Sequence, residues 1–400
     1  MTKKLNVAKA AVAAAAAAIL ISGTAVAQEI KLGFNGDLSA SPSAQSGQAA
    51  VLGIRAAIED VNAAGGVLGR NLTLAVRDDL SQPPKSIQNM SDLIDNEKVV
   101  AILGPTNSGN ALAWKHIPNQ KKIPVINPIS TSTDITKPVS AGADNYMFRV
   151  SMVDREQISG LLAYTKANPA AKKIGFMGET TGYGQAGLKD LQEVSQLYGV
   201  KPVTTEKFGV NDTDMTSQLN KLKGAGVDTI LVWAQGTALG QLERSKQKVD
   251  YFPQTITSWA ADNNSFLDAA GKELASKPLF LRTISPELTP KQQQLFDRLS
   301  SQISSASPFG FAAHAYDATM LVVHAIKQAG TTEGPKVREA LENLETPYDG
   351  YMKTYNKPFS KTNHEALTAA DYKWVKWEDG KLAPYSDETT KSLKPSDFKK

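Results

Sequence analysis

Residues 47–66 read GQAAVLGIRAAIEDVNAAGG and predict an amphipathic helix that ends at a glycine pair. Its branched apolar residues recur at intervals of three, four and three: Val51, Ile54, Ile58 and Val61. This spacing places them in one apolar stripe along a helix. Gly65 and Gly66 follow, where a backbone with positive φ ends a helix at no steric cost. The stretch therefore predicts a helix over residues 47–63.

Short apolar runs lie on both sides of this helix, and the same alternation continues along the chain. Strands are predicted at residues 30–34, 72–76, 99–103, 125–126, 174–177, 203–208, 229–233, 255–258 and 279–281. Further helices are predicted at 84–96, 108–120, 155–167, 184–198, 215–224, 238–248, 290–304, 311–329 and 335–344. Strict alternation of strand and helix implies an α/β fold with parallel sheets that helices cover on both faces.

The strand count predicts two such sheets, with a break near residues 149–154. After Gly350 the pattern changes to short strands at 351–355 and 372–377, with a turn at Glu378-Asp379-Gly380. The final residues are rich in Lys, Ser and Pro and predict a loosely held tail.

Residues 1–27 have the three parts of a secretory signal peptide. Lys3, Lys4 and Lys9 precede or enter an alanine-rich apolar run, and Ala25-Val26-Ala27 forms a small-residue cleavage site. A membrane anchor needs about 20 continuous apolar residues, and this run is shorter. We therefore expect Gln28 to begin a mature, exported protein that works in the periplasm, with no membrane span.

The composition excludes several classes of function. Removing the three leader lysines lowers the formal charge from +4 to +1, so the surface offers no electrostatic argument for nucleic acid. The chain has no cysteine, which excludes disulfides, thiol catalysis and cysteine-based zinc sites. It has four histidines, and no two have a convincing metal-ligand spacing. No metal and no cofactor are expected.

Two loops that follow predicted strands carry hydroxyl groups directly before helix starts. Residues 104–109 read GPTNSG, with Asn107 and Ser108, and residues 127–133 read NPISTST, with Ser130 and Thr131. In open parallel sheets such loops converge where ligands bind. Hydroxyls and free backbone N–H groups at helix starts favour an anion, such as a small carboxylate. The alternative is that these hydroxyls only cap helices, at about 1 kcal/mol each.

Other strand-end residues are open to two interpretations. Asp154 begins the pattern Asp-x-x-Gln, which is typical of a capping box, but its carboxylate could also reach a ligand's ammonium group. Tyr183 stands between two glycines that expose it at the sheet edge, and this loop lacks the phosphate-binding patterns. Gln235 and Trp259 lie just beyond two further strands, where the tryptophan is either a core residue or a ligand platform.

Hydrolase chemistry has little support in the sequence. No G-x-S-x-G elbow occurs, and no histidine stands in a loop beside a plausible serine and aspartate. We therefore expect the chain not to be an enzyme.

The chain resembles the periplasmic solute-binding proteins of branched-chain amino-acid ABC transporters, the leucine/isoleucine/valine-binding type. The resemblance covers essentially all of the chain after the leader and rests on the order and spacing of individually weak pieces. These are Gly53-Ile54, Glu59 to Arg70, Asp78-Asp79, Gly104-Pro105-x-x-Ser108, Pro128-x-Ser130-Thr131, Phe148-Arg149, Asp154, Tyr183-Gly184, Asp212-Thr213-Asp214, Lys221-Leu222-Lys223, Ala315-Tyr316-Asp317-Ala318 and Val375-x-x-x-Asp379-Gly380.

The resemblance implies the type I periplasmic binding protein fold: two doubly wound parallel-sheet lobes, joined by three hinge crossovers, that close on a ligand. It implies one lobe from residues 28–150 with 284–370 and another from 151–283 with 371–390, followed by a tail at 391–400. The positions of Ser108, Ile129 and Thr131 would hold an amino acid's carboxylate. That of Asp154 would meet the ammonium, and Tyr183 would close from the second lobe.

Two positions depart from the family pattern. Where amino-acid binders carry a glutamate for the ammonium, this chain has Trp259, and where they carry a tryptophan over the ligand, it has Ser46. Phe311 matches an aromatic that lines the side-chain pocket. Losing a buried carboxylate partner costs an ammonium several kcal/mol unless Asp154 compensates. The ligand could thus be an amino acid such as leucine, or an aromatic or other organic acid.

The resemblance also implies partners, namely an ABC permease and its ATPase, with the chain acting as a monomer. Two other classes of function remain open: a ligand sensor of the same fold, and an exported α/β enzyme.

Overall fold

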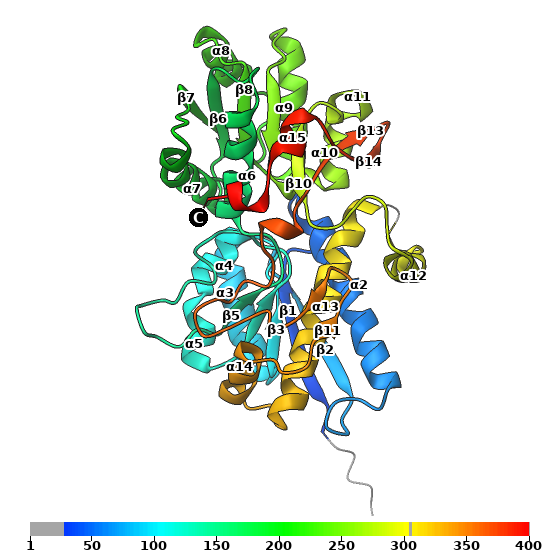
Figure 1. Ribbon diagram of the computed structural model, residues 1–400. Coiled ribbons are helices and arrows are strands. Elements are labelled where there is room, and N and C mark those ends of the chain that lie inside the picture. Colours follow the sequence, from blue (N-terminus) through cyan, green and yellow to red (C-terminus); the bar gives the residue numbers. More distant parts are fainter. Residues whose placement is uncertain (1–27, 304–305, 400) are drawn as a thin grey trace, which may run out of the picture.

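The computed structural model describes residues 28–303 and 306–399. Two α/β lobes stand one above the other, each built on its own sheet (Figure 1). The predicted signal peptide, residues 1–27, lies outside the described residues. Among the residues described, no helix is both long and apolar enough to cross a membrane.

The first lobe is built on a five-stranded parallel sheet with the order β2-β1-β3-β4-β5. Its strands are β1 (Ile30–Gly36), β2 (Leu72–Asp78), β3 (Ala101–Leu103), β4 (Val125–Asn127) and β5 (Met147–Arg149). Its helices are α2 (Ala44–Ala63), α3 (Pro83–Ser91), α4 (Ser108–Trp114), α5 (His116–Lys121), α12 (Pro290–Leu299), α13 (Ala306–Ala329) and α14 (Gly334–Glu342). A hairpin of β11 (Tyr348–Asp349) and β12 (Thr354–Tyr355) completes it.

The helix predicted from residues 47–63 is α2, and it packs against α13 in the core of this lobe. Its apolar stripe is buried there at Ile54, Ile58 and Val61. Gly53 allows the close approach of the two helices, because a Cβ at this position would lie 1.9 Å from the carbonyl oxygen of Ala312. The sequence pattern thus brings an N-terminal and a C-terminal helix together.

The second lobe is built on a seven-stranded sheet with the order β14-β13-β10-β9-β8-β6-β7. Its strands are β6 (Ile174–Glu179), β7 (Thr204–Phe208), β8 (Thr229–Trp233), β9 (Gln254–Thr257), β10 (Leu279–Arg282), β13 (Lys373–Glu378) and β14 (Lys381–Pro384). Its helices are α6 (Asp154–Ala167), α7 (Gly182–Tyr198), α8 (Thr216–Gly224), α9 (Gly236–Lys248), α10 (Asn264–Ala270), α11 (Lys272–Ala275) and α15 (Glu388–Ser392).

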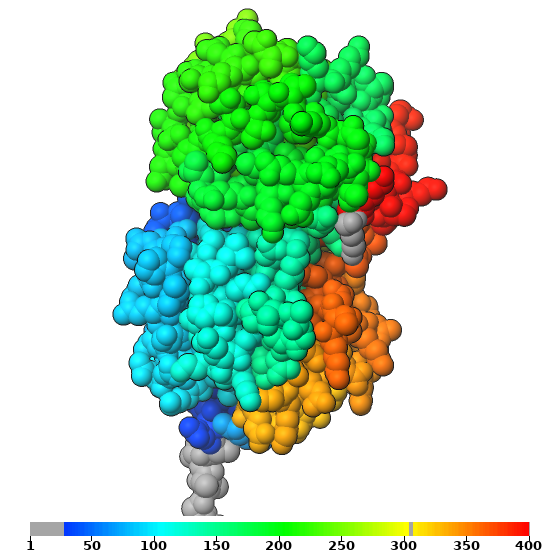
Figure 2. Space-filling model, turned by 90° about the vertical axis from the view of Figure 1, so that its left-hand side faces the viewer, coloured from blue at the N-terminus to red at the C-terminus, as the bar shows by residue number. Residues whose placement is uncertain are grey.

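The chain crosses between the lobes three times. It leaves the first lobe after β5 through residues 150–153, returns after β10 through residues 283–289, and leaves again after the short helix Ala369–Asp371. On the face shown in Figure 2 the two lobes meet along a continuous boundary. The predicted fold class, two α/β lobes joined by three crossovers, is confirmed. The residue boundaries of the lobes stay a prediction.

Some elements differ from the sequence prediction. The second sheet is parallel except at one edge, where β13 and β14 run antiparallel to their neighbours. The strand β5 and the short helices α10 and α11 are absent from the prediction, because three to seven residues are too few to establish a period. Of the strand predicted at residues 351–355, only Thr354–Tyr355 forms a strand, β12.

The prediction of a loosely held tail is wrong for residues 397–399, which pack on the second lobe. The Phe398 ring lies on α6, where a Cβ at Gly160 would meet it at 2.5 Å. Ser159 donates a hydrogen bond to the carbonyl oxygen of Lys399 (2.7 Å), and the Lys399 N–H donates to the Tyr198 hydroxyl (2.8 Å). Residues 397–399 are therefore fastened to α6 and α7.

Candidate ligand-binding site between the lobes

A cavity with about 470 Å³ of space free of protein atoms lies between the lobes, beyond the carboxyl ends of their strands. The first lobe contributes Pro42, Ser43, Ser46, Thr106, Asn107, Ser108, Ile129, Ser130, Thr131 and Phe311. The second lobe contributes Tyr183, Gln235, Gly236, Trp259, Ala260 and Asn263. The structure therefore brings together every site residue predicted from the sequence except Asp154.

The hydroxyl of Ser108 is held by the neighbouring loop of its own lobe. Its oxygen accepts hydrogen bonds from the backbone N–H groups of Thr131 (3.2 Å) and Ser132 (3.1 Å). The capping interpretation is wrong for Ser108, because Asn107 is the N-cap of α4 and accepts from the Gly109 N–H. Since the oxygen already accepts two hydrogen bonds, the hydroxyl hydrogen is left to donate to a ligand.

The second hydroxyl loop is shaped by Asn127 at the end of β4. Its Oδ1 accepts from the N–H groups of Ile129 (3.0 Å) and Ser130 (2.9 Å). The expectation of free backbone N–H groups at Ile129 and Thr131 is therefore wrong in this conformation, because all of them already have protein acceptors. The available donors on this wall are side-chain hydroxyls. That of Ser130 is buried and has no partner among the described residues.

The wall from the second lobe is built on two strand ends. Tyr183 is the second residue of α7, and its hydroxyl donates a hydrogen bond to the Ser258 hydroxyl (2.6 Å). Gln235 is fixed by Glu179, which accepts from the Gln235 N–H (2.8 Å) and from its Nε2 (3.0 Å). Its Oε1 is buried and lacks a partner within the described part of the chain.

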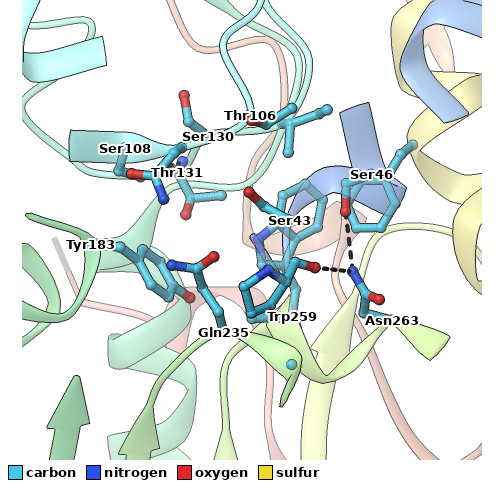
Figure 3. Close-up of a pocket in the computed structure, with 16 residues that line it drawn as sticks. Ser43, Ser46, Thr106, Ser108, Ser130, Thr131, Tyr183, Gln235, Trp259 and Asn263 are labelled. Carbon is cyan, nitrogen blue, oxygen red and sulfur yellow. Dashed lines mark hydrogen bonds between the residues drawn. The ribbon is translucent and has the colours of Figure 1, made fainter. Parts of the chain in front are cut away.

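Trp259 is both a packed residue and a wall of the cavity. It is 5% exposed, and its ring meets that of Phe311 edge-to-face with the centroids 5.1 Å apart. Its backbone N–H donates to Gln157 Oε1 (3.0 Å), which fixes the loop after β9. Figure 3 shows Trp259, Tyr183 and Gln235 facing the hydroxyl-bearing residues of the first lobe. The tryptophan is thus a core residue and also a wall of the cavity, so the two interpretations from the sequence do not exclude each other.

Asp154 lies behind the cavity instead of lining it. It is fully buried at the start of α6, and its backbone N–H donates to the carbonyl oxygen of Thr131 (2.8 Å). Burial raises the pKa of Asp154 to about 8, and the nearby charge of Asp190 acts in the same direction. The capping box predicted with Gln157 is not formed, because Val153 is the N-cap and no side chain caps the helix.

Direct contacts join the lobes around the cavity. On one side Asn263 Nδ2 donates to Ser46 Oγ and to the Pro42 carbonyl oxygen, both at 3.3 Å (Figure 3). On the other side Thr133 donates to Asp190 (2.7 Å), and Lys189 pairs with Asp134 (2.6 Å). These contacts describe a closed conformation.

The sequence interpretation missed six lining residues: Pro42, Ser43, Thr106, Gly236, Ala260 and Asn263. Thr106 stood in a loop already singled out, and Ser43 follows the end of β1, so the rule of strand-end loops could have found both. The sequence around Asn263 indicates only a helix start, and its side chain does cap α10 by accepting a hydrogen bond from the Ser265 N–H. Its contact with the other lobe carries no sequence signal.

The cavity is uncharged. Of the residues described, those that line it include no Asp, Glu, Lys or Arg. In the described ranges there is also no group of three or more His, Asp or Glu side chains that could hold a metal ion.

Comparison with known proteins places this geometry in a family. A family model described as periplasmic binding protein matches residues 29–381. The chain belongs to the periplasmic binding protein family. The resemblance found in the sequence is thereby confirmed, and the family is one of binding proteins, not of enzymes.

Individual relatives are distant but match over most of their length. An amino acid binding protein of Pseudomonas aeruginosa is 24% identical, over 95% of this chain and 98% of the relative. A leucine-, isoleucine-, valine-, threonine- and alanine-binding protein of the same organism is 26% identical, over 83% and 88%.

Solved structures share the fold. A type 1 periplasmic binding protein from Bordetella pertussis superimposes with a TM-score of 0.81 at 23% identity, covering 90% of this chain and all of the other. The branched-chain amino acid transporter substrate-binding protein of Streptococcus pneumoniae, solved with isoleucine, gives 0.76 at 24% identity, over 89% and 98%.

Proposed function

We propose that this periplasmic binding protein is the extracytoplasmic solute-binding component of an ABC importer. It captures a small carboxylate-bearing ligand between its lobes and presents the closed form to a permease and its ATPase. The observation that carries the proposal is the cavity, which is lined from both lobes and enclosed by contacts between them. The leader sequence supports a periplasmic location, and amino-acid-binding relatives support a ligand of that size.

In this proposal the ligand bridges the two walls. Ser108, Ser130 and Thr131 donate hydrogen bonds to its carboxylate from the first lobe, beside Ser46, Asn107, Ile129 and Phe311. Tyr183, Gln235 and Trp259 contact it from the second lobe. Because no single lobe supplies all these groups, binding favours the closed state, and a permease can recognise that state.

A thermal-shift screen of amino acids, aromatic acids and dicarboxylates tests this function directly. A ligand at 100 times its dissociation constant adds about 2.7 kcal/mol of stability, which is readily seen. A complete absence of shifts across the three classes would contradict a small carboxylate ligand.

We expect the ligand to close the molecule in solution. Small-angle scattering of the ligand-free protein should give a larger radius of gyration than the closed structure, because only the ligand offsets the cost of bringing two polar walls together. Saturating ligand should reduce the radius of gyration to that of the structure. Scattering curves that superimpose with and without a bound ligand would rule out closure.

We expect Ser108→Ala to weaken ligand binding by about 1.5–3 kcal/mol, the value for a hydrogen bond to a charged group. Isothermal calorimetry measures the change. Ser132→Ala is the matched control, since Ser132 is its buried neighbour but does not line the cavity. Equal affinity of a folded Ser108→Ala protein and the wild type would remove Ser108 from the site.

A further inference from the structure

The acids nearest the cavity, Glu179 and Asp154, lie behind its walls and do not line it. Glu179 is 2% exposed and accepts hydrogen bonds from Thr181 and from both the backbone and the side chain of Gln235. Burial raises its pKa, as it does that of Asp154, which lies behind Thr131. Asp154 Oδ2 has no hydrogen-bond partner within the described residues, but Asp154 is fully buried. Neither carboxylate therefore lines the cavity.

An ammonium group would therefore enter this cavity without a charged partner. It carries three N–H donors and a full charge, and it loses its hydration on burial. The acceptors that the cavity offers are neutral, chiefly the Oε1 of Gln235 and the hydroxyl oxygens of Tyr183 and Thr131. Unpaired burial of a charge is costly, so this cavity discriminates against an α-ammonium.

A carboxylate finds better partners. The hydroxyls of Ser108, Ser130 and Thr131 converge on one end of the cavity, and Figure 3 shows them together on the first lobe. The Ser108 oxygen already accepts two backbone N–H groups, so its own hydrogen is free for an acceptor. Hydrogen bonds from hydroxyls to an ionised carboxylate are short and strong.

The rest of the cavity suits an apolar body. Trp259 and Phe311 present an aromatic corner, and the ring of Tyr183 lies on the same side as Trp259 in Figure 3. The unpartnered Oε1 of Gln235 is the remaining buried acceptor on this wall, and it fits a neutral O–H or N–H of the ligand.

We infer that the ligand is a small monocarboxylate that lacks an α-ammonium group and whose apolar body lies against Trp259 and Tyr183. This inference rests on the proposed function and names its ligand class. It separates this chain from relatives whose names specify amino acids.

Calorimetry with matched pairs tests the inference on the wild-type protein. L-Phenylalanine and 3-phenylpropanoate differ only in the ammonium, and so do L-leucine and 4-methylpentanoate. We expect the member without the ammonium to bind at least tenfold more tightly in at least one pair. An amino acid that binds as tightly as its partner, or more tightly, in both pairs would overturn the inference.

A charge introduced at Trp259 provides a second, independent readout. Trp259→Glu and Trp259→Gln remove the same ring and differ only in charge, so their comparison cancels the loss of packing. We expect the Glu variant to bind the amino acid of each pair at least tenfold more tightly than the Gln variant does. Equal amino-acid affinities in two variants with equal melting temperatures would show that the lack of a charged partner is not what disfavours an ammonium, contrary to the inference.

The outcomes also separate the ligand class from the function. Amino acids that bind the wild type and contract it in small-angle scattering would leave the solute-binding function standing and overturn the inference alone. Failure of every member of both pairs to bind would count against both. If the variants do not fold, the wild-type pairs decide.

Discussion

Replacing Gly182 by leucine is expected to abolish tight ligand binding while both lobes stay folded. Gly182 begins α7 in the second lobe, and a Cβ at this position would lie 2.7 Å from the Cα of Gly109 in the first lobe. That distance is shorter than Cβ contacts in real proteins, and the clashing atom is backbone, so it cannot rotate away. The lobes must therefore separate. The lost contacts with Tyr183, Gln235 and Trp259 amount to about 4 kcal/mol, or about 1,000-fold in affinity.

Calorimetry measures the affinity, and small-angle scattering should show a molecule that no longer contracts with ligand. Gly224→Leu is the matched control, because Gly224 also lies in a helix of the second lobe and a Cβ there meets nothing within 4 Å. We expect the control to bind normally. A Gly182→Leu protein with wild-type affinity and contraction would show that the two glycines do not meet in the ligand-bound state.

Asp154→Asn is expected to stabilise the closed, ligand-bound protein, and to do so more strongly as the pH rises. The pKa of Asp154 is raised by burial to about 8, whereas an aspartate in an unfolded chain titrates near 3.9. Its contribution to stability is fully present below pH 4 and is lost as the pH rises towards 8, because only the unfolded chain ionises in that window. At pH 7 the loss is about 4 kcal/mol, and asparagine avoids it.

Melting temperatures at pH 4.5 and pH 8 measure this effect, with little difference between the proteins at the lower pH. Asp134→Asn provides a control of opposite sign, because Lys137 and Lys189 lower the pKa of Asp134 to about 2 despite partial burial. Its ionised form supports the fold at neutral pH, so we expect that variant to be less stable than the wild type at pH 8. Parallel pH profiles of Asp154→Asn and the wild type would mean that Asp154 is ionised in the folded protein.

Long periodic segments made most of the fold predictable. The helix at residues 47–63 and the strand at residues 229–233 combine a clear period with apolar runs, and the structure places them within one turn of the predicted bounds. What was missed depends on distant contacts. The three residues of β5 form a strand because β4 pairs with them. Residues 397–399 are held because Lys399 hydrogen-bonds to Tyr198 and the Phe398 ring packs against Gly160. No local pattern encodes such a partner.

The candidate site was predictable for a different reason. The rule that parallel strands deliver their following loops to one edge located Ser108, Thr131, Tyr183 and Gln235 without knowledge of any contact. The same rule could not predict that the backbone N–H groups of Thr131 and Ser132 donate hydrogen bonds to the Ser108 oxygen. It also could not place Asp154 behind the wall, because burial depends on how two lobes meet.

The fastening of residues 397–399 to the second lobe makes the chain suitable as a two-colour optical reporter. The first described residues lie at the pole of the first lobe that is farthest from the second, whereas Lys399 lies against α6 and α7 of the second lobe (Figure 1). A donor dye near residue 28 and an acceptor near residue 399 would thus sit on different lobes. Because residues 397–399 move together with the helices of the second lobe, energy transfer between the dyes would report the angle between the lobes and not the motion of a flexible terminus.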